Sequence, residues 1–324
     1  MKRALTPHGC LLACRLAGVA ALLASPSLAM ADSMANVVEK ARLDVQPVGG
    51  RPFKKITIEN ALGDVIVEGY DGTAIIIETK KSAPDEEALE RLRISLVPNS
   101  DGTVRLTTTA DRDKESKPLP RGQVRIDLKV RAPRDARIEA TASSGLLTLS
   151  NMDAGGDLES GSGAIKVRNV SGELSTHSVS GATSLATVFG SVDSQTLQSD
   201  LDLDSISGEK LVASANHGKI AGRRVRSREI ELTTTDGKIT LEAETTLRGR
   251  IVVSSVKGDV DVKLRRRNTG VIVRARGARV DFGVPAPAPI NGWTENRLGN
   301  TAAAGTASVE MRSRYGNVLF TIVE

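Results

Sequence analysis

Two clusters of basic residues are the most chemically distinctive feature of this sequence. The clusters contain Arg223, Arg224, Arg226 and Arg228, and then Lys263, Arg265, Arg266 and Arg267. Guanidinium groups gathered on one face attract acidic polymers such as lipopolysaccharide or peptidoglycan. The same side chains could instead pair with acids on neighbouring strands, and we favour that interpretation. If a binding surface is formed, its candidate residues are Arg223, Arg224, Arg265, Arg266 and Arg267.

The sequence contains no pattern typical of catalysis or of a bound metal. The run DLDLD at 200–204 resembles a calcium loop, but an EF-hand needs Gly and Glu where Ser205 and Leu211 stand. We interpret the run as a strand with its leucines inward. His177 and His217 lie at different distances from their turns and would not form a metal pair, and no GxSxG motif is present. We predict no catalytic, cofactor-binding or metal-binding residues, no cofactor and no enzymatic activity.

Residues 1–31 have the pattern of a secretory signal peptide. Three basic residues precede or flank an apolar stretch at 16–23, and Ala-Met-Ala at 29–31 forms a small-x-small cleavage pattern. The apolar stretch is too short for a membrane helix, which needs roughly 20 residues. Both cysteines, Cys10 and Cys14, lie in this segment. We therefore expect an exported protein, periplasmic or at the cell surface, without a disulfide or a transmembrane segment in its mature chain.

Charge and composition narrow the function classes further. The chain has 44 basic and 39 acidic side chains, a formal net charge of +5. Three of the bases and none of the acids lie in 1–31, so the mature chain has a net charge of only +2. Nucleic-acid-binding proteins carry a strong basic excess on one face, so we expect no nucleic-acid partner. Aromatic residues make up only 2% of the chain, which favours a thin core of aliphatic side chains.

A repeat of about nineteen residues must position all of these side chains. Its turn position is occupied in successive copies by Gly145, Gly163, Gly181, Ser199, Gly218, Gly237 and Gly258. Aliphatic residues follow two and four places after most of these turns, and a period of two puts them on one face of a strand. A second series of glycines at 172, 190 and 208 marks another turn in each copy. A fixed period of this length is typical of a repeat architecture.

We therefore predict an all-β fold, a right-handed parallel β-solenoid with about 18–21 residues per coil. Parallel crossover connections are right-handed in about 98% of cases. The predicted divisions are a signal peptide (1–31), a leader without a strong pattern (32–52), a β-rich N-terminal cap region (53–141), the solenoid repeats (142–284), and a Pro-rich loop with C-terminal strands that complete or cap the solenoid (285–324). Within the cap region, PDEEALERL at 84–92 begins with Pro and acids and predicts one short helix.

Three segments are similar to the DUF4097 family, whose members are described as candidate adhesins or head GIN-like proteins. They are IENALGDVIVEGYDGTAIIIETKKSA at 58–83, the helix PDEEALERLRISL that follows, and VRIDLKVRAPRDARIEATASSGLLTLSN at 124–151. The glycine-spaced repeats after them have the same character. The resemblance implies an extracytoplasmic β-repeat protein with a solenoid body. It implies no enzymatic activity and supplies no functional residue signature.

These observations together predict a non-catalytic, extracytoplasmic β-solenoid that acts as an adhesin-like binding or structural module of the cell envelope. Its expected partner is a cell-envelope polymer or a cell-surface protein. A polysaccharide-active β-helix enzyme, either a lyase or a hydrolase, is an alternative, and it would need unpaired carboxylates beside Arg223 or Arg224. A self-assembling envelope scaffold is a second alternative, and it would need an uncapped apolar end.

Overall fold

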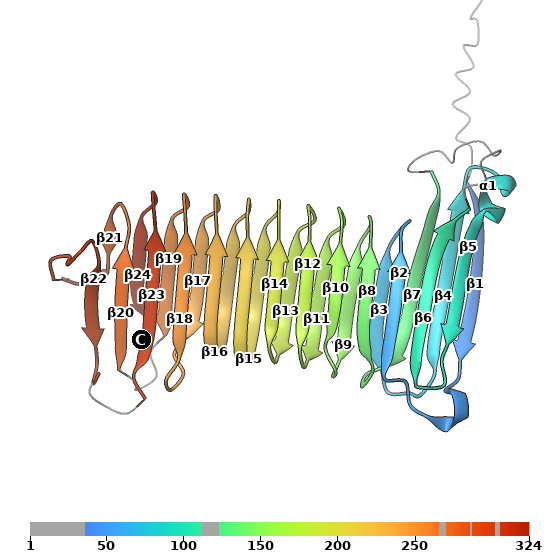
Figure 1. Cartoon of the computed structure of the whole chain (residues 1–324), viewed down its shortest axis with the longest axis horizontal. Coiled ribbons are helices and arrows are strands. Elements are labelled where there is room, and N and C mark those ends of the chain that lie inside the picture. Colours follow the sequence, from blue (N-terminus) through green and yellow to red (C-terminus); the bar gives the residue numbers. More distant parts are fainter. Residues whose placement is uncertain (1–35, 112–122, 266–269, 286, 302–304, 324) are drawn as a thin grey trace, which may run out of the picture. The chain divides into compact units, whose positions relative to one another are not determined.

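The computed structural model describes residues 36–111, 123–265, 270–285, 287–301 and 305–323. These residues form a nearly all-β structure whose strands pair side by side in two stacks, A and B (Figure 1). The predicted signal peptide at 1–31 lies outside the described residues. One α-helix, α1 (Glu86–Glu90), and one 3-10 helix, η1 (Val48–Gly50), are also present in the described ranges.

Each coil of the chain contributes one strand to stack A and one to stack B, and the two long strands β15 and β16 belong to both. Stack A contains, in order of pairing, β1 (Val37–Val45), β4 (Ile75–Ala83), β7 (Arg125–Pro133), β3 (Val65–Tyr70), β9 (Leu147–Met152), β11 (Ile165–Ser171), β13 (Thr183–Phe189), β15 (Leu201–Ala215), β16 (Ile220–Thr234), β17 (Ile239–Glu244), β19 (Val260–Arg265), β24 (Val318–Val323) and β21 (Val280–Asp281). Stack B contains β5 (Leu92–Pro98), β6 (Thr103–Ala110), β2 (Lys55–Asn60), β8 (Arg137–Ala142), β10 (Gly156–Ser160), β12 (Leu174–Ser178), β14 (Val192–Thr196), the second parts of β15 and β16, β18 (Arg250–Ser255), β23 (Ala307–Ser313), β20 (Val271–Arg276) and β22 (Thr294–Leu298).

The pairing register aligns the columns that the repeat predicts. In stack A, Leu147 pairs with Ile165, which pairs with Thr183 in the next coil, and that residue pairs in turn with Leu201. All of these pairs are parallel. Each inward column therefore continues from coil to coil, and its side chains are almost fully buried. The interior is a stack of aliphatic layers, as the low aromatic content predicts.

A column of hydroxyl groups borders the aliphatic core in stack B. Its members stand three residues before a turn position: Ser160, Ser178, Thr196, Thr234, Ser255 and Ser313. The Ser178 hydroxyl donates to the Gly181 carbonyl oxygen at 2.6 Å and accepts from the Gly181 N–H at 3.1 Å. Buried polar groups are costly unless they are hydrogen-bonded. The hydroxyl column therefore satisfies the backbone of the tight turns from inside.

The turn glycines allow the coils to approach one another closely. A Cβ added to Gly163 would lie 2.5 Å from the Gly145 carbonyl carbon and would overlap the carbonyl oxygen. Ser199 is the exception in this column, and its hydroxyl donates to the Gly181 carbonyl oxygen at 2.6 Å. Glycine is thus required at most turns by backbone contact between successive coils.

The strands are not stacked in chain order at the N-terminal end. The coil formed by β2 and β3 lies between the coil of β8 and β9 and the coil of β6 and β7. Antiparallel strands β4 and β5 then cover β7 and β6, and β1 pairs outside β4. Parallel pairing therefore begins inside the N-terminal region that the sequence predicts as a cap. The leader also contains a strand, β1, which its sequence does not predict because most of its residues are exposed and show no alternation.

The C-terminal end has a similar insertion. The last coil, formed by β23 and β24, lies between β18–β19 and β20–β21, although β20 and β21 come first in the chain. Strand β22 then pairs antiparallel with β20 on the outer side. Both ends of the parallel stack thus carry at least one antiparallel strand.

Candidate functional site

The predicted basic residues Arg223 and Arg224 are paired with acids. Nη2 of Arg223 lies 2.8 and 2.9 Å from the two carboxylate oxygens of Asp202, and Arg224 forms an ion pair with Asp204. Nε of Arg224 also donates to the Ser205 hydroxyl at 2.9 Å. The carboxylates that a polysaccharide-active enzyme would need beside these arginines are therefore engaged in ion pairs.

Arg224 and the third described candidate, Arg265, line one shallow depression of about 650 Å³. Arg223 is not among its lining residues. Cations in this depression again face acids, because Arg226 contacts Glu244 at 2.5 Å and Lys263 lies 3.7 Å from Glu242. The Lys263–Glu242 pair is exposed on both sides, and exposed pairs typically contribute about 0.2–1 kcal/mol. The remaining candidates, Arg266 and Arg267, lie outside the described residues.

A corner in each coil determines which acids Arg223 and Arg224 pair with. Register places Arg223 opposite Asp204, but Asp204 forms its ion pair with Arg224 instead. Arg224 has a φ of 52°, the last of a column of positive-φ residues with Asn151, Asn169, Thr187 and Ser205. The register shifts between Gly222 and Val225, next to this corner. Asn151 and Asn169 end two consecutive repeats in the sequence, and this recurring Asn is the signal for the column. The side-chain amide of Asn169 donates a hydrogen bond to the side-chain oxygen of Asn151 at 2.8 Å.

The two described histidines, His177 and His217, have different surroundings. Nδ1 of His217 lies 2.8 Å from Asp236, whose other carboxylate oxygen lies 3.0 Å from Lys257. Hydrogen bonds from Lys257 and then His217 lower the pKa of Asp236. His177 is exposed on β12. Among the described residues, no group of three or more His, Cys, Asp and Glu side chains is arranged to hold a metal ion.

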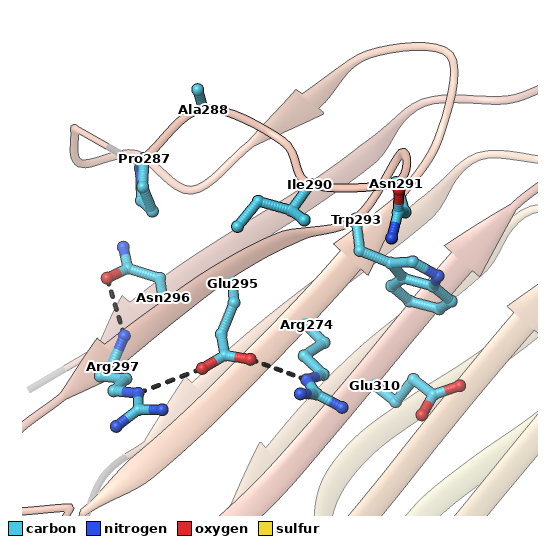
Figure 2. A pocket seen from close by; sticks show the side chains of 10 residues that line it. All are labelled: Arg274, Pro287, Ala288, Ile290, Asn291, Trp293, Glu295, Asn296, Arg297 and Glu310. Carbon is cyan, nitrogen blue, oxygen red and sulfur yellow. Dashed lines mark hydrogen bonds and ion pairs between the residues drawn. The ribbon is translucent and has the colours of Figure 1, made fainter.

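A depression of about 840 Å³ lies at the C-terminal end of stack B, where a loop folds back over the outward face (Figure 2). The loop contains a two-residue hairpin, because the N–H of Ile290 donates to the Trp293 carbonyl oxygen at 2.8 Å and the reverse bond is 3.0 Å. Between them, Asn291 and Gly292 have φ values of 51° and 78°. Two positive φ values are the requirement of a type I′ turn, for which Asn-Gly is a preferred pair. The Asn-Gly pair signals this hairpin in the sequence, but the hairpin was not predicted.

The floor of this depression is a charge network between β20 and β22. Figure 2 shows Glu295 between Arg274 and Arg297, with contacts of 2.8 and 3.1 Å. Hydrogen bonds from Arg274 and then Arg297 lower the pKa of Glu295. The Glu310 side chain is drawn beside Arg274, and the Trp293 ring stands at the edge of the depression. The site therefore combines an aromatic side chain, carboxylates and amides over the sheet, groups that can donate and accept hydrogen bonds.

Comparison with protein families gives a match over most of the chain. The model of the family described as Toastrack DUF4097 matches residues 53–319. The chain belongs to the Toastrack DUF4097 family. The predicted resemblance is thereby confirmed, and the matched residues include the stacked repeats and the loop with Trp293. No significant relative is found among curated proteins.

Three solved structures to which the chain is similar come from Bacteroides and Parabacteroides species. A candidate adhesin from Bacteroides fragilis is 12% identical, with a TM-score of 0.41, and the match covers 87% of this Toastrack chain and 97% of the other. A candidate lipid-binding protein from Parabacteroides distasonis is also 12% identical, with a TM-score of 0.42, and coverage is 89% and 97%. A candidate adhesin from Parabacteroides merdae is 12% identical, with a TM-score of 0.36, and coverage is 89% and 96%. These descriptions are not those of enzymes.

Proposed function

We propose that this protein is an exported, non-catalytic and adhesin-like binding module of the cell envelope. The supporting observation is the regular outward surface of stack B. One row of mostly polar side chains runs through neighbouring strands from Glu139 through Asp157, Ser175 and Asp193, passes Val212 and reaches Glu231. Parallel strands repeat about every 4.8 Å. Such rows present polar groups at fixed intervals, which suits an extended or repetitive partner.

The extracytoplasmic location rests on the sequence of residues 1–31, with its basic residues, apolar stretch and small-x-small pattern. Among the described residues, no helix is both long enough and apolar enough to cross a membrane. We infer a protein that acts beyond the cytoplasmic membrane, either in the periplasm or at the cell surface.

The same proposal includes the details of the solenoid. We infer a right-handed coil because parallel crossover connections strongly favour that hand. We also infer coils of about 18–21 residues and the division into residues 53–141, 142–284 and 285–324. Pairing of Leu147 with Ile165, and of Leu201 with Ile220, supports this period.

Retention on envelope material tests the proposed function. The protein, expressed with its own N-terminal segment and then purified, is incubated with intact cells, isolated peptidoglycan or lipopolysaccharide and sedimented. We expect the folded protein to sediment with at least one of these materials, and the same protein unfolded in urea and diluted serves as the control. Light scattering on the purified protein measures self-association in parallel. Absence of retention of the folded protein on every material would refute the proposal.

A further inference from the structure

A second depression, of about 540 Å³, is also lined by Trp293. Its lining includes Ser254 at the end of β18, Arg276 at the end of β20, Arg312 on β23 and Arg314 just after it. We call these residues, together with Trp293, the arginine pocket. Its volume lies within the range of about 300–1,000 Å³ that small-molecule sites occupy.

Pairing register places two of the arginines directly beside each other. Arg312 pairs with Ser254 on one side and with Arg276 on the other, and both arginine side chains are exposed. Nε of Arg312 donates to the Ser254 hydroxyl at 2.8 Å. The Arg276 guanidinium lies beneath the hairpin, since a Cβ on Gly292 would be 3.5 Å from its Nε. The pocket therefore presents these guanidinium groups on the sheet, with Arg276 beside the hairpin.

The charges of the pocket are uncompensated in the structure. Within the described parts of the chain, Arg276, Arg312 and Arg314 form no ion pair, and the Arg314 guanidinium instead lies 5.1 Å from the ring centroid of Tyr315. Like charges directly opposite each other on neighbouring strands are destabilising.

The preceding row of the same strands shows the contrast. There Arg274 stands between Glu295 and Glu310 in register and bonds to Glu295 at 2.8 Å. The cation in the row of Arg274 is therefore paired with an acid, whereas those in the row of Arg276 and Arg312 are not. Such an unpaired cluster is stabilised by a bound anion.

We propose that the arginine pocket binds an acidic oligosaccharide. The guanidinium groups of Arg276 and Arg312 can each donate two parallel hydrogen bonds to a carboxylate or sulfate on the sugar. The Trp293 indole supplies a large, rigid and partly polar surface against which a sugar ring packs. This inference rests on the proposed function, because it names the ligand class of the binding module.

The position of Trp293 explains why an oligosaccharide is favoured over a free anion. Trp293 lines both the arginine pocket and the depression of about 840 Å³ shown in Figure 2. A second sugar can therefore continue past the indole toward Asn291, Asn296 and Glu310, whose side chains offer hydrogen bonds to hydroxyl groups. The acidic sugar occupies the arginine pocket, and its neutral neighbour occupies the carboxylate-containing side.

Fluorescence of Trp293 provides the test because it is the only tryptophan of the chain. The purified protein is titrated with tetragalacturonic acid as the carboxylate probe and with a heparin-derived tetrasaccharide as the sulfate probe. Maltotetraose is the neutral control and inorganic phosphate the free-anion control. We expect saturable fluorescence changes with at least one acidic oligosaccharide, weakening as salt rises because the contacts are ionic. Calorimetry checks each affinity independently.

Two double variants separate the pocket from bulk charge. Arg276→Ser with Arg312→Ser should weaken acidic oligosaccharide binding by about tenfold or more, since charge-assisted hydrogen bonds are lost. Arg223→Ser with Arg228→Ser removes the same charge from residues already paired with Asp202 and Glu209, and should change the affinity by less than about twofold. Circular dichroism establishes that both variants are folded, and Arg314→Ser is a single-site alternative to the pocket variant.

The outcomes distinguish this inference from the proposed function. Binding of maltotetraose or of inorganic phosphate as tight as that of the acidic oligosaccharides would overturn the inference, as would equal losses in the two double variants or no binding at all. If wild type and the pocket variant sediment equally with envelope material, the inference fails and the proposed function stands. If wild type binds the acidic probe through the pocket but is retained on no envelope material, the site stands and the proposed function fails.

Discussion

Replacement of Gly163 by Ala tests whether backbone contact between coils holds the stack together. The new Cβ would lie 2.5 Å from the Gly145 carbonyl carbon, whereas real Cβ contacts essentially never fall below 3.0 Å. The turn must therefore move away from the coil below it. Two hydrogen bonds cross this junction, from the Gly161 N–H to Ala142 at 3.0 Å and from the Ser162 N–H to Ser143 at 3.1 Å. Loss of these hydrogen bonds, with some opening of the core, should lower the free energy of unfolding by about 2–4 kcal/mol.

Urea unfolding followed by far-UV circular dichroism measures this effect. Midpoints are compared rather than extrapolated free energies, because repeat arrays can depart from two-state unfolding. Ser162→Ala is the matched control in the same turn, and it removes only a 3.3 Å hydrogen bond from an exposed hydroxyl. Loss of this bond should cost less than about 1 kcal/mol, so the urea midpoint of the control should fall less than that of Gly163→Ala. Equal midpoints for the two variants would show that the close approach of the turns does not limit stability.

Three other predictions follow from side chains described above. Ser178→Ala should lower the free energy of unfolding by about 1–3 kcal/mol, because it leaves the buried N–H and carbonyl groups of Gly181 without their hydrogen-bond partner. The urea midpoint should fall accordingly, and an unchanged midpoint would contradict this role. Gly292→Val should loosen the hairpin, since β-branched residues disfavour its φ of 78°, and acrylamide quenching of Trp293 should rise while the unfolding midpoint stays constant. The pKa of Glu295 is lowered by Arg274 and Arg297, so their interaction is present above the ordinary glutamate pKa and is lost as pH falls through the lowered value. Arg297→Gln should raise the titration midpoint of the Glu295 carboxyl in NMR spectra, and an unchanged midpoint would exclude Arg297 as a cause.

The stacked part of the fold could be predicted because its signals are local. A tight turn excludes side chains and a period of two separates buried from exposed residues, so both properties can be read along the chain. The register Leu147, Ile165, Thr183 and Leu201 follows directly from the spacing of the turns.

The order of the terminal coils could not be predicted in the same way. Strand β24 pairs with β19, and the earlier strand β21 pairs outside it. Every strand of the stack has similar aliphatic columns, so sequence pattern does not say which strand lies beside which when the chain returns from a loop. The same ambiguity applies to β2 and β3 at the N-terminal end.

The candidate site was missed because it depends on these terminal coils. Arg276 and Arg312 are 36 positions apart in the chain and become neighbours only through the insertion of β23 beside β20. By contrast, the arginines that cluster in sequence, such as Arg223 and Arg224, meet acids of the preceding coil. Local density of basic residues is therefore a poor guide to free positive charge in this fold, whereas Asn291-Gly292 did signal the hairpin.

The inserted coil of β23 and β24 constrains the order of assembly during synthesis. Strands β20 and β21 leave the ribosome before residues 307–323 exist, yet their neighbours in the finished molecule are those later residues. The middle coils can therefore form one after another, but β20 and β21 lack their neighbouring strands until residues 307–323 are present. Pairing of β20 and β21 with those residues cannot precede their synthesis, so a molecule interrupted before residue 307 would expose the edges of β18 and β19 to any other strand it meets.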